Sequence, residues 1–276
     1  DMIDWLLDRV PPGREADVVY FNPADAAYPF GLNLLYRQDI NNEEETSWVV
    51  DTIISTLHRL NQASWGPRLE HVLSYTLWTA MNMMPHPTLL EVLLLLTDEA
   101  YRKGWIKQLN DATLKSFWDE FPWHQRERLE LIASTVNKLT PFLLDKRMRN
   151  IVGQRENTFN LRELMDKDAI LLVDLSKGRL GEHKSALLGS VIVNLILIAA
   201  LSRGQKTPEE RRAHPFHVIV DEYQNFASES FSVLQSEARK YAVDLVVAHQ
   251  FRDQLSLEVR GSALNVGNFI CFRTVG

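Results

Sequence analysis

Cysteine is almost absent, since Cys271 is the single one among 276 residues. A lone cysteine excludes an intrachain disulfide, and because it lies in the apolar run 268–272 we expect a buried thiol. The eight histidines show no metal-ligand spacing, so no zinc site is expected. The longest apolar run, 186–201, is shorter than the roughly 20 residues that span a bilayer. We therefore expect a core helix there.

Two motifs that mark common enzyme sites are also missing. The chain has no G-x-S-x-G turn for a nucleophile and no G-x-x-x-x-G-K-[ST] loop to hold nucleotide phosphates. Residues 176–185, SKGRLGEHKS, follow a strand pattern and precede a helix pattern, but their spacing is G-x-x-G-x-x-K-S. We do not assign a phosphate loop to them, and we expect the chain alone to be inactive towards nucleotides.

An excess of basic residues is lacking too. The formal net charge is −6 at pH 7, which argues against a protein that coats nucleic acid with its whole surface. A local DNA path remains open in 138–155, where Lys146, Arg147 and Arg149 are concentrated. The alternative interpretation is a solvated helix end, whose cations lie near the negative end of the helix dipole.

The motif that is present is HVIVDEYQNF, at 217–226. Its apolar β-branched residues predict a buried central strand, and two adjacent carboxylates follow at the carboxyl end. This pattern is typical of a Walker B strand: Asp221 can hold the water shell of Mg²⁺, and Glu222 can orient and deprotonate an attacking water. The same pattern also occurs as an ordinary strand end with a solvated acidic turn.

A β-α-β unit is predicted around this motif. Phe231, Leu234 and Ala238 recur at helical spacing, and 244–250 is a second apolar strand. A right-handed crossover lays the two strands parallel, so that Gln250 reaches the sheet edge of Asp221 and Glu222. Open α/β sheets bind ligands at that edge. We favour Gln250 as a polar sensor of phosphate or water, with a cap or loop residue as the alternative.

Strand and helix patterns divide the chain. Residues 1–42 and 167–276 carry the strand patterns, including 18–21, 169–174 and 268–273, whereas 43–166 reads as helices alone. The predicted helices of this segment are 48–60, 69–84, 88–109, 111–121 and 126–139. Six tryptophans lie in it: Trp48, Trp65, Trp78, Trp105, Trp118 and Trp123. They could form a base-stacking platform, but large aromatics at helical spacing are more often core. The helix 183–203 then precedes the DEYQ strand.

Several blocks together resemble the conjugative coupling ATPases of type IV secretion, within the HerA-FtsK superfamily. The similar blocks occur in the family's order: DWLLDRVPPGREADVVYFNPAD, RNIVGQ, ILLVDLSKGRLGE, VDEYQNFASESF, SEARKYAVDLVVAHQ and NVGNFICFR. The resemblance implies an α/β fold: an incomplete, mostly parallel RecA-like P-loop NTPase core (1–42 and 167–276) with an inserted all-α domain (43–166). The first block resembles a stretch that follows the Walker A helix in this family. The chain is therefore expected to be a fragment that lacks the Walker A loop.

The resemblance also implies an activity, an ATP-driven DNA translocase that uses ATP and Mg²⁺. In that family Asp221 and Glu222 match the Walker B acids, Gln250 matches the sensor glutamine, and Arg239 matches the arginine finger. Arg273 matches a recurrent arginine of the final strand. The implied partners are DNA, a relaxase or other secretion cargo, the secretion-channel proteins and five further copies in a homo-hexamer. The implied location is cytoplasmic, at the inner membrane face if a segment outside this chain anchors the protein.

Two other functions remain open from the residues. The helical segment could recognise a protein cargo while the α/β part serves as a non-catalytic scaffold. Alternatively, Asp221, Glu222, Tyr223 and Gln224 form a DExQ-type helicase box, although motifs of a second RecA-like lobe are not visible. A Walker A loop upstream in the parent gene would favour the translocase, and its absence would favour the binding module.

Overall fold

The computed structural model describes residues 2–122, 124–226, 229–250, 255, 260–261 and 266–272. Four strands form two separate parallel pairs. β1 (Val18–Phe21) pairs with β2 (Ile170–Val173), and β3 (Phe216–Val220) pairs with β4 (Val243–Val247). The mostly parallel character expected from the sequence is confirmed, but the described strands make two small sheets instead of one.

The chain between β1 and β2 is helical. In its described part it contains eight α-helices and no strand: α2 (Glu43–Leu60), α3 (Pro67–Met83), α4 (Leu89–Thr97), α5 (Glu99–Ile106), α6 (Ala112–Asp119), α7 (Gln125–Leu144), α8 (Lys146–Val152) and α9 (Leu161–Asp166). The other α-helices are α1 (Met2–Leu7), α10 (Lys177–Leu180), α11 (Glu182–Ser202), α12 (Pro208–Ala213) and α13 (Glu229–Glu237).

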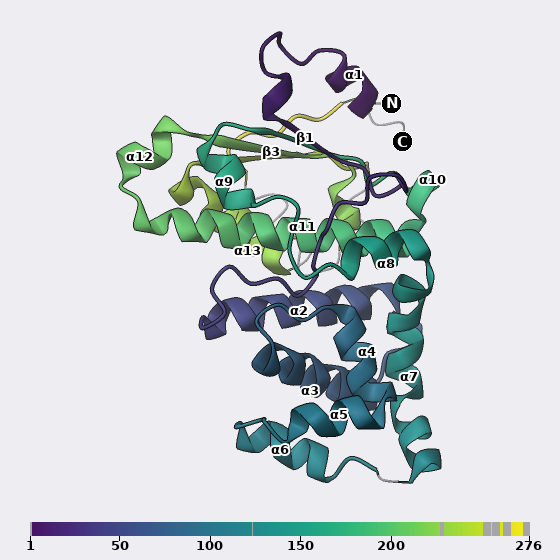
Figure 1. Cartoon of the computed structure of the whole chain (residues 1–276). Helices are drawn as coiled ribbons and strands as arrows, with labels where there is room; N and C mark the ends of the chain where they lie inside the picture. The colour runs from purple at the N-terminus through teal and green to yellow at the C-terminus, as the bar shows by residue number, and fades with distance from the viewer. Residues whose placement is uncertain are drawn as a thin grey trace.

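The helix α11 forms the centre of the molecule. Fifteen of its 21 residues are buried, because its apolar side chains point in every direction and must be covered all round. Figure 1 shows the strands on one side of α11 and α2 on the other, with α3 to α6 stacked beyond α2. By length and composition this helix could cross a membrane, but 83% of its most apolar window is buried inside the protein. The expected core helix is confirmed.

One predicted helix is interrupted. The sequence pattern over 88–109 predicts a single helix, but α4 ends at Thr97 and α5 begins at Glu99. Between them Asp98 takes an extended conformation, with φ −104° and ψ 114°, and its carboxylate accepts a hydrogen bond from the Tyr101 amide at 2.9 Å. A capping aspartate stabilises a new helix start, so the chain turns at this point.

The described tryptophans of the helical segment pack in the core, as large aromatic side chains at helical spacing usually do. Trp118 is 4% exposed and donates from its indole nitrogen to the Thr79 hydroxyl at 2.8 Å. The side chains of Trp48, Trp65, Trp78 and Trp105 pack partly buried against the same core. The core interpretation is therefore confirmed for these five, while Trp123 lies outside the described residues.

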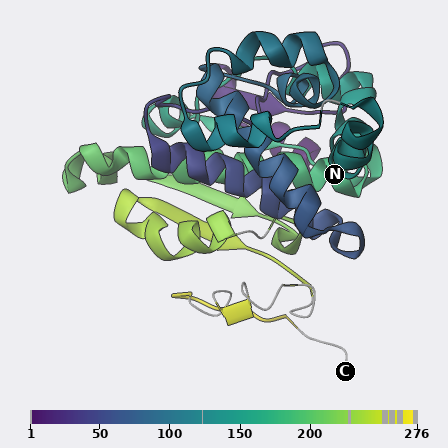
Figure 2. The same ribbon diagram turned by 90° about the horizontal axis from the view of Figure 1, so that it is seen from below.

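The prediction of a last strand at 268–273 is wrong for residues 268–272, the part that the structure describes. Residues 268–272 pair with no strand within the described chain, and Phe272 is 85% exposed. In Figure 2 this segment lies apart from the helices. Cys271, expected to be buried, is exposed for the same reason. A strand forms only where a neighbouring edge offers hydrogen bonds, and an apolar pattern does not supply that neighbour. Arg273 lies outside the described residues.

A glycine on α11 fixes the position of the segment after β3. A Cβ atom built on Gly189 would lie 2.2 Å from Cδ1 of Phe226, the residue that closes the DEYQNF motif. We predict that Gly189→Ala forces the Phe226 ring to move and lowers the free energy of unfolding by about 1–3 kcal/mol, as overpacking does. Urea denaturation measures this change.

Gly178→Ala is the matched control. Gly178 also lies in a helix, but nothing lies within 4 Å of the position that a Cβ atom would take there. Alanine at this position should be neutral or stabilise the fold by up to about 1 kcal/mol, since it is the better helix former. Equal effects of the two substitutions would contradict the Gly189–Phe226 contact.

Candidate functional site

β3 and β4 place the predicted site residues at one sheet edge. The two strands are parallel with Val220 opposite Val247, so their carboxyl ends coincide. The Ala248 amide donates to the Val220 carbonyl at 2.9 Å, and the Tyr223 amide donates to the Ala248 carbonyl at 3.0 Å. The predicted β-α-β unit is confirmed, including its buried helix face: Phe231, Leu234 and Ala238 are at most 3% exposed.

The strand β3 is buried on one face only, which corrects the expectation of a fully buried strand. Val218 is 7% exposed and faces the core, whereas Ile219 is 74% exposed on the other face. The partner of Ile219 in β4, Val246, is 57% exposed. On the same outer face Nδ1 of His217 lies 3.0 Å from a carboxylate oxygen of Asp244 across the two strands. Described helices cover just the inner face of this sheet.

Glu222 has an unusual backbone and a fully engaged side chain. Its φ of 51° and ψ of 41° lie in the left-handed region, which non-glycine residues rarely adopt. Its Oε1 accepts a hydrogen bond from the Gln250 amide group at 2.5 Å, and its Oε2 accepts one from the Gln224 amide group. The structure therefore brings Glu222 and Gln250 into direct contact, although they are 28 residues apart.

Asp221 lies beside Glu222 with part of its carboxylate open. Its Oδ1 accepts a hydrogen bond from the Glu222 amide at 2.9 Å, and the side chain is exposed. No hydrogen bond to Oδ2 occurs among the described residues. No cluster of three or more His, Cys, Asp or Glu that could hold a metal occurs in the described part of the chain. A metal at this edge would therefore need oxygen ligands from elsewhere, as Mg²⁺ takes from water and phosphates.

The segment 176–185 has a different role from a phosphate loop. The Ser185 hydroxyl donates to the Leu175 carbonyl at 2.6 Å, and Lys184 forms an ion pair with Asp145. Gly181, with φ 82°, is the N-cap residue directly before α11. These groups hold α10 and α11 in place, which agrees with the spacing argument against a phosphate loop.

Arg239 lies at the opposite edge of the β3–β4 sheet. It is in the 3-10 turn η5 (Ala238–Tyr241) directly before β4, where Val243 pairs with Phe216, the first residue of β3. Glu222 follows the last residue of β3. A strand of five residues is about 16 Å long, so the exposed Arg239 side chain cannot reach the Glu222 of its own chain.

The three basic residues predicted as a DNA path lie in α8, with Lys146 and Arg147 at its start and Arg149 in its last turn. All three are exposed. Arg147 lies 3.9 Å from Asp145, and Arg149 donates to the carbonyl of Leu143, in the last turn of α7, at 3.3 Å. Lys146 makes no ion pair or hydrogen bond within the described residues. The basic group is therefore exposed, as a DNA path requires. The alternative, a cation at the negative end of a helix dipole, holds for Arg149 at the end of α7, whereas Lys146 and Arg147 begin α8 at the positive end of its dipole.

Tyr223 and Gln224, which the sequence offered only as part of a DExQ-type helicase box, contribute to the geometry of the site. Gln224 donates to the second carboxylate oxygen of Glu222. The sequence signal for this contact was the position of Gln224 two residues after Glu222 in the DEYQ motif. Tyr223 is fully buried and stacks on Phe231 with ring centroids 5.3 Å apart. It anchors the turn that carries Glu222. No pattern of periodicity predicts such a contact.

Comparison with known proteins gives the fold. No protein-family model and no curated protein sequence matches the chain. Solved structures of the bacterial conjugative coupling protein TrwB are similar to it. TrwBdeltaN70 gives a TM-score of 0.57 in both its unbound monoclinic form and its trigonal form with sulphate, and the plasmid coupling protein TrwB with ADP and Mg²⁺ gives 0.56.

The alignments cover most of this chain but only part of each TrwB chain. Each covers 91% of this chain and 56–57% of the TrwB chain, at 14% identity. The chain thus spans just over half the length of these coupling-protein chains. Its fold is TrwB-like, helix-rich with small parallel sheets, which supports the expected fold class at the level of overall architecture.

Proposed function

We propose that this chain is part of an ATP-driven DNA translocase, a coupling protein that moves DNA or nucleoprotein through a type IV secretion or conjugation system. The observation that carries the proposal is the contact of Glu222 with Gln250 at the coincident ends of two parallel strands. The TrwB-like fold supports it, because one of the similar TrwB structures is a complex with ADP and Mg²⁺.

The described residues fit the metal and γ-phosphate side of a nucleotide site. Asp221 offers an exposed carboxylate oxygen, the donor type that Mg²⁺ prefers, and would hold the ion through water. When bound, Mg-ATP supplies the phosphoryl group and the charge that the metal neutralises. The phosphate cradle is a separate requirement, because this sequence contains no G-x-x-x-x-G-K-[ST] loop.

Glu222 would act as the base that accepts a proton from the attacking water. Its two oxygens accept hydrogen bonds from Gln250 and Gln224, so the carboxylate is held in one orientation before any substrate arrives. One of these amide groups must yield its place to the water. Gln250 is a better candidate than Gln224 for the sensor of phosphate or water. It follows the end of the neighbouring strand β4, so its hydrogen bond links that strand to the Glu222 carboxylate.

The position of Arg239 supports catalysis across subunits. Since the length of β3, about 16 Å, separates it from its own Glu222, an arginine finger at this position would serve the site of a neighbouring copy. This requires a ring of subunits, and we propose a homo-hexamer. The proposed partners of that ring are DNA, a relaxase or other secretion cargo, and the secretion-channel proteins. So is a cytoplasmic position at the inner face of the membrane.

We predict that Glu222→Gln in the natural protein that carries this sequence keeps nucleotide binding but lowers the rate of ATP hydrolysis by about 100-fold or more. The glutamine retains the size of the side chain but cannot accept the proton. Phosphate release and calorimetric Mg-ATP binding measure the two effects. Glu237→Gln, which changes the same charge beside Lys240, should leave the rate intact. Unchanged hydrolysis by Glu222→Gln would refute the Walker B role.

A DNA path along α8 predicts a change in salt dependence. Replacing Lys146, Arg147 and Arg149 by glutamine should weaken binding of a duplex oligonucleotide. It should also lower the slope of log K against log salt by about 2 to 3, since fewer counterions are released. Fluorescence anisotropy over a potassium chloride series measures the slope.

The control for this triple variant removes three exposed cations elsewhere on the helical segment, Arg68, Lys107 and Lys115. If binding depends on net charge alone, both triple variants will change the slope equally. If α8 lies outside the DNA path, the α8 variant will keep the slope of the parent.

Action of Arg239 in a neighbouring site predicts rescue by mixing. Arg239→Ala subunits and Glu222→Gln subunits should each be inactive alone. A mixed ring should regain part of the ATP hydrolysis, because some interfaces then join an intact Glu222 to an intact Arg239 from the next copy. The measurement is the hydrolysis rate across mixing ratios.

Mass photometry or native mass spectrometry must show that the mixed rings form. Lys240→Ala provides a neighbouring control, since it removes an exposed cation of the same turn that is paired with Glu237. Mixed rings that stay inactive at every ratio would exclude an arginine finger at position 239.

A further inference from the structure

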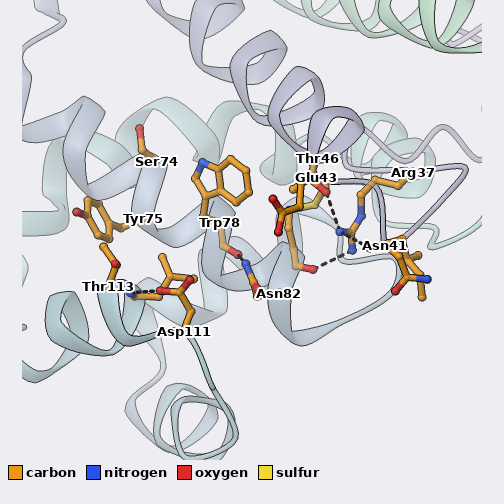
Figure 3. Close-up of a pocket in the computed structure, with 13 residues that line it drawn as sticks. Arg37, Asn41, Glu43, Thr46, Ser74, Tyr75, Trp78, Asn82, Asp111 and Thr113 are labelled. Atoms are coloured by element: carbon orange, nitrogen blue, oxygen red, sulfur yellow. Dashed lines mark hydrogen bonds between the residues drawn. The ribbon is translucent and has the colours of Figure 1, made fainter. Parts of the chain in front are cut away.

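A groove of about 690 Å³ lies in the helical part of the molecule, away from Glu222. Its lining residues come from the loop before α2 and from α2, α3 and the start of α6 (Figure 3). Its volume falls in the range of about 300–1,000 Å³ that is usual for ligand pockets. The groove therefore has the size of a binding site that the proposed ATPase chemistry does not use.

Aromatic and aliphatic side chains form one wall of the groove. Tyr75, Trp78 and Met81 lie three residues apart along α3, and Tyr75 and Trp78 are both half-buried, so each presents part of its ring to the groove. Figure 3 shows Trp78 between Tyr75 and Glu43. A partly exposed indole attracts cations through its negative face and also packs against aliphatic chains.

The exposed charge of the groove is negative. Glu43, in the first turn of α2, makes no ion pair or hydrogen bond among the described residues, and it is exposed. Asp111 caps α6 by accepting a hydrogen bond from the Leu114 amide at 2.8 Å through Oδ1. Its Oδ2 accepts none within the described chain. Two carboxylates on different elements therefore face the groove with free oxygens.

The single cation among the thirteen lining residues does not offset this charge at the surface. Arg37 is 4% exposed. Its guanidinium donates to the Thr46 hydroxyl at 3.0 Å and to four backbone carbonyls, those of Ile40, Met81, Met84 and Pro85. Arg37 thus ties the loop before α2 to the end of α3 and keeps the wall of the groove in place.

We infer that this groove binds a cationic peptide segment, with a lysine or arginine side chain across the Trp78 indole and its charge at Glu43 or Asp111. Aliphatic side chains of the same peptide cover Ile40, which is 43% exposed, while the buried Met81 forms the floor beneath it. A small cation would leave this apolar wall uncovered, and nucleic-acid phosphates would be repelled by the two carboxylates. The inference is independent of the proposed ATPase activity, because no lining residue comes from β3, β4 or the turn after β3.

The test uses a dye-labelled peptide of sequence GLRSLRLG and a second peptide in which both arginines are replaced by glutamate. In fluorescence anisotropy at low salt, the arginine peptide should bind the 276-residue chain and the glutamate peptide should bind at least about tenfold more weakly. Millimolar or absent binding of the arginine peptide, or equal binding of the two, would overturn the inference.

Site variants locate the binding. The double substitution Glu43→Gln and Asp111→Asn should weaken the arginine peptide about tenfold, since each exposed ion pair contributes about 1.4- to 5-fold. Asparagine preserves the cap of α6, so the fold is retained. Trp78→Leu should weaken binding about threefold through loss of the cation–π contact.

The matched control removes the same charge outside the groove. Glu44→Gln and Asp119→Asn change exposed carboxylates of α2 and α6 that do not line the cavity. This control should bind the arginine peptide as the parent does, and far-UV circular dichroism checks that every variant is folded. Equal loss in the control and the groove variant would show nonspecific charge attraction and would overturn the inference, as would parental affinity in both.

Discussion

A helix without a polar face has to be covered on every side, and this constraint organises the molecule. The side chains of α11 are buried around nearly its whole circumference. α13 and the strands cover one side, and α2 of the helical segment covers another. The helical segment and the α/β part therefore share one continuous hydrophobic core. The domain boundary predicted at residue 43 follows the change from strands to helices along the chain. In space, however, the two parts pack directly against each other, and the contact includes a hydrogen bond from Arg59 to Ser190 at 3.0 Å.

The carboxyl end of α11 shows how the core positions β3. Arg203 is fully buried, and burial lowers the pKa of its guanidinium. It donates to the Arg211 carbonyl at 3.0 Å and to the His214 carbonyl, and lies 3.7 Å from Asp166. Burial alone would raise the pKa of Asp166, but hydrogen bonds from Lys206 and Arg162 hold it below the ordinary value. The polar loop between α11 and β3 is thus fastened to a buried charge network directly before the strand begins.

Much of this arrangement was predictable because the decisive interactions are local. β1 has the predicted bounds, 18–21, and the pairing of β3 with β4 follows from one short crossover helix. The break at Asp98 was missed because the apolar pattern continues through it. What starts a new helix there is the hydrogen bond from the Tyr101 amide to the Asp98 side chain, and an apolar pattern does not reveal such a bond. The exposure of Ile219 and Cys271 could not be predicted. An apolar pattern states that a residue can be buried, while the element that covers it is a property of tertiary structure.

The candidate site shows the same division. A β-α-β unit lays its two strands parallel, so their carboxyl ends meet at one edge of the sheet. The sequence was therefore enough to predict that Glu222 and Gln250 lie at the same edge. The left-handed backbone at Glu222 does not follow from any pattern, and conformations of this kind cost of order 1 kcal/mol or more. It persists because the Ala248 amide and carbonyl hold Val220 and Tyr223 on either side, and because Tyr223 is buried against Phe231. The strain is therefore balanced by β4 and by the core beneath the turn. Gln250 donates directly to the carboxylate that this turn presents, so under the proposed function the strand whose end carries the sensor also holds the turn that carries the base.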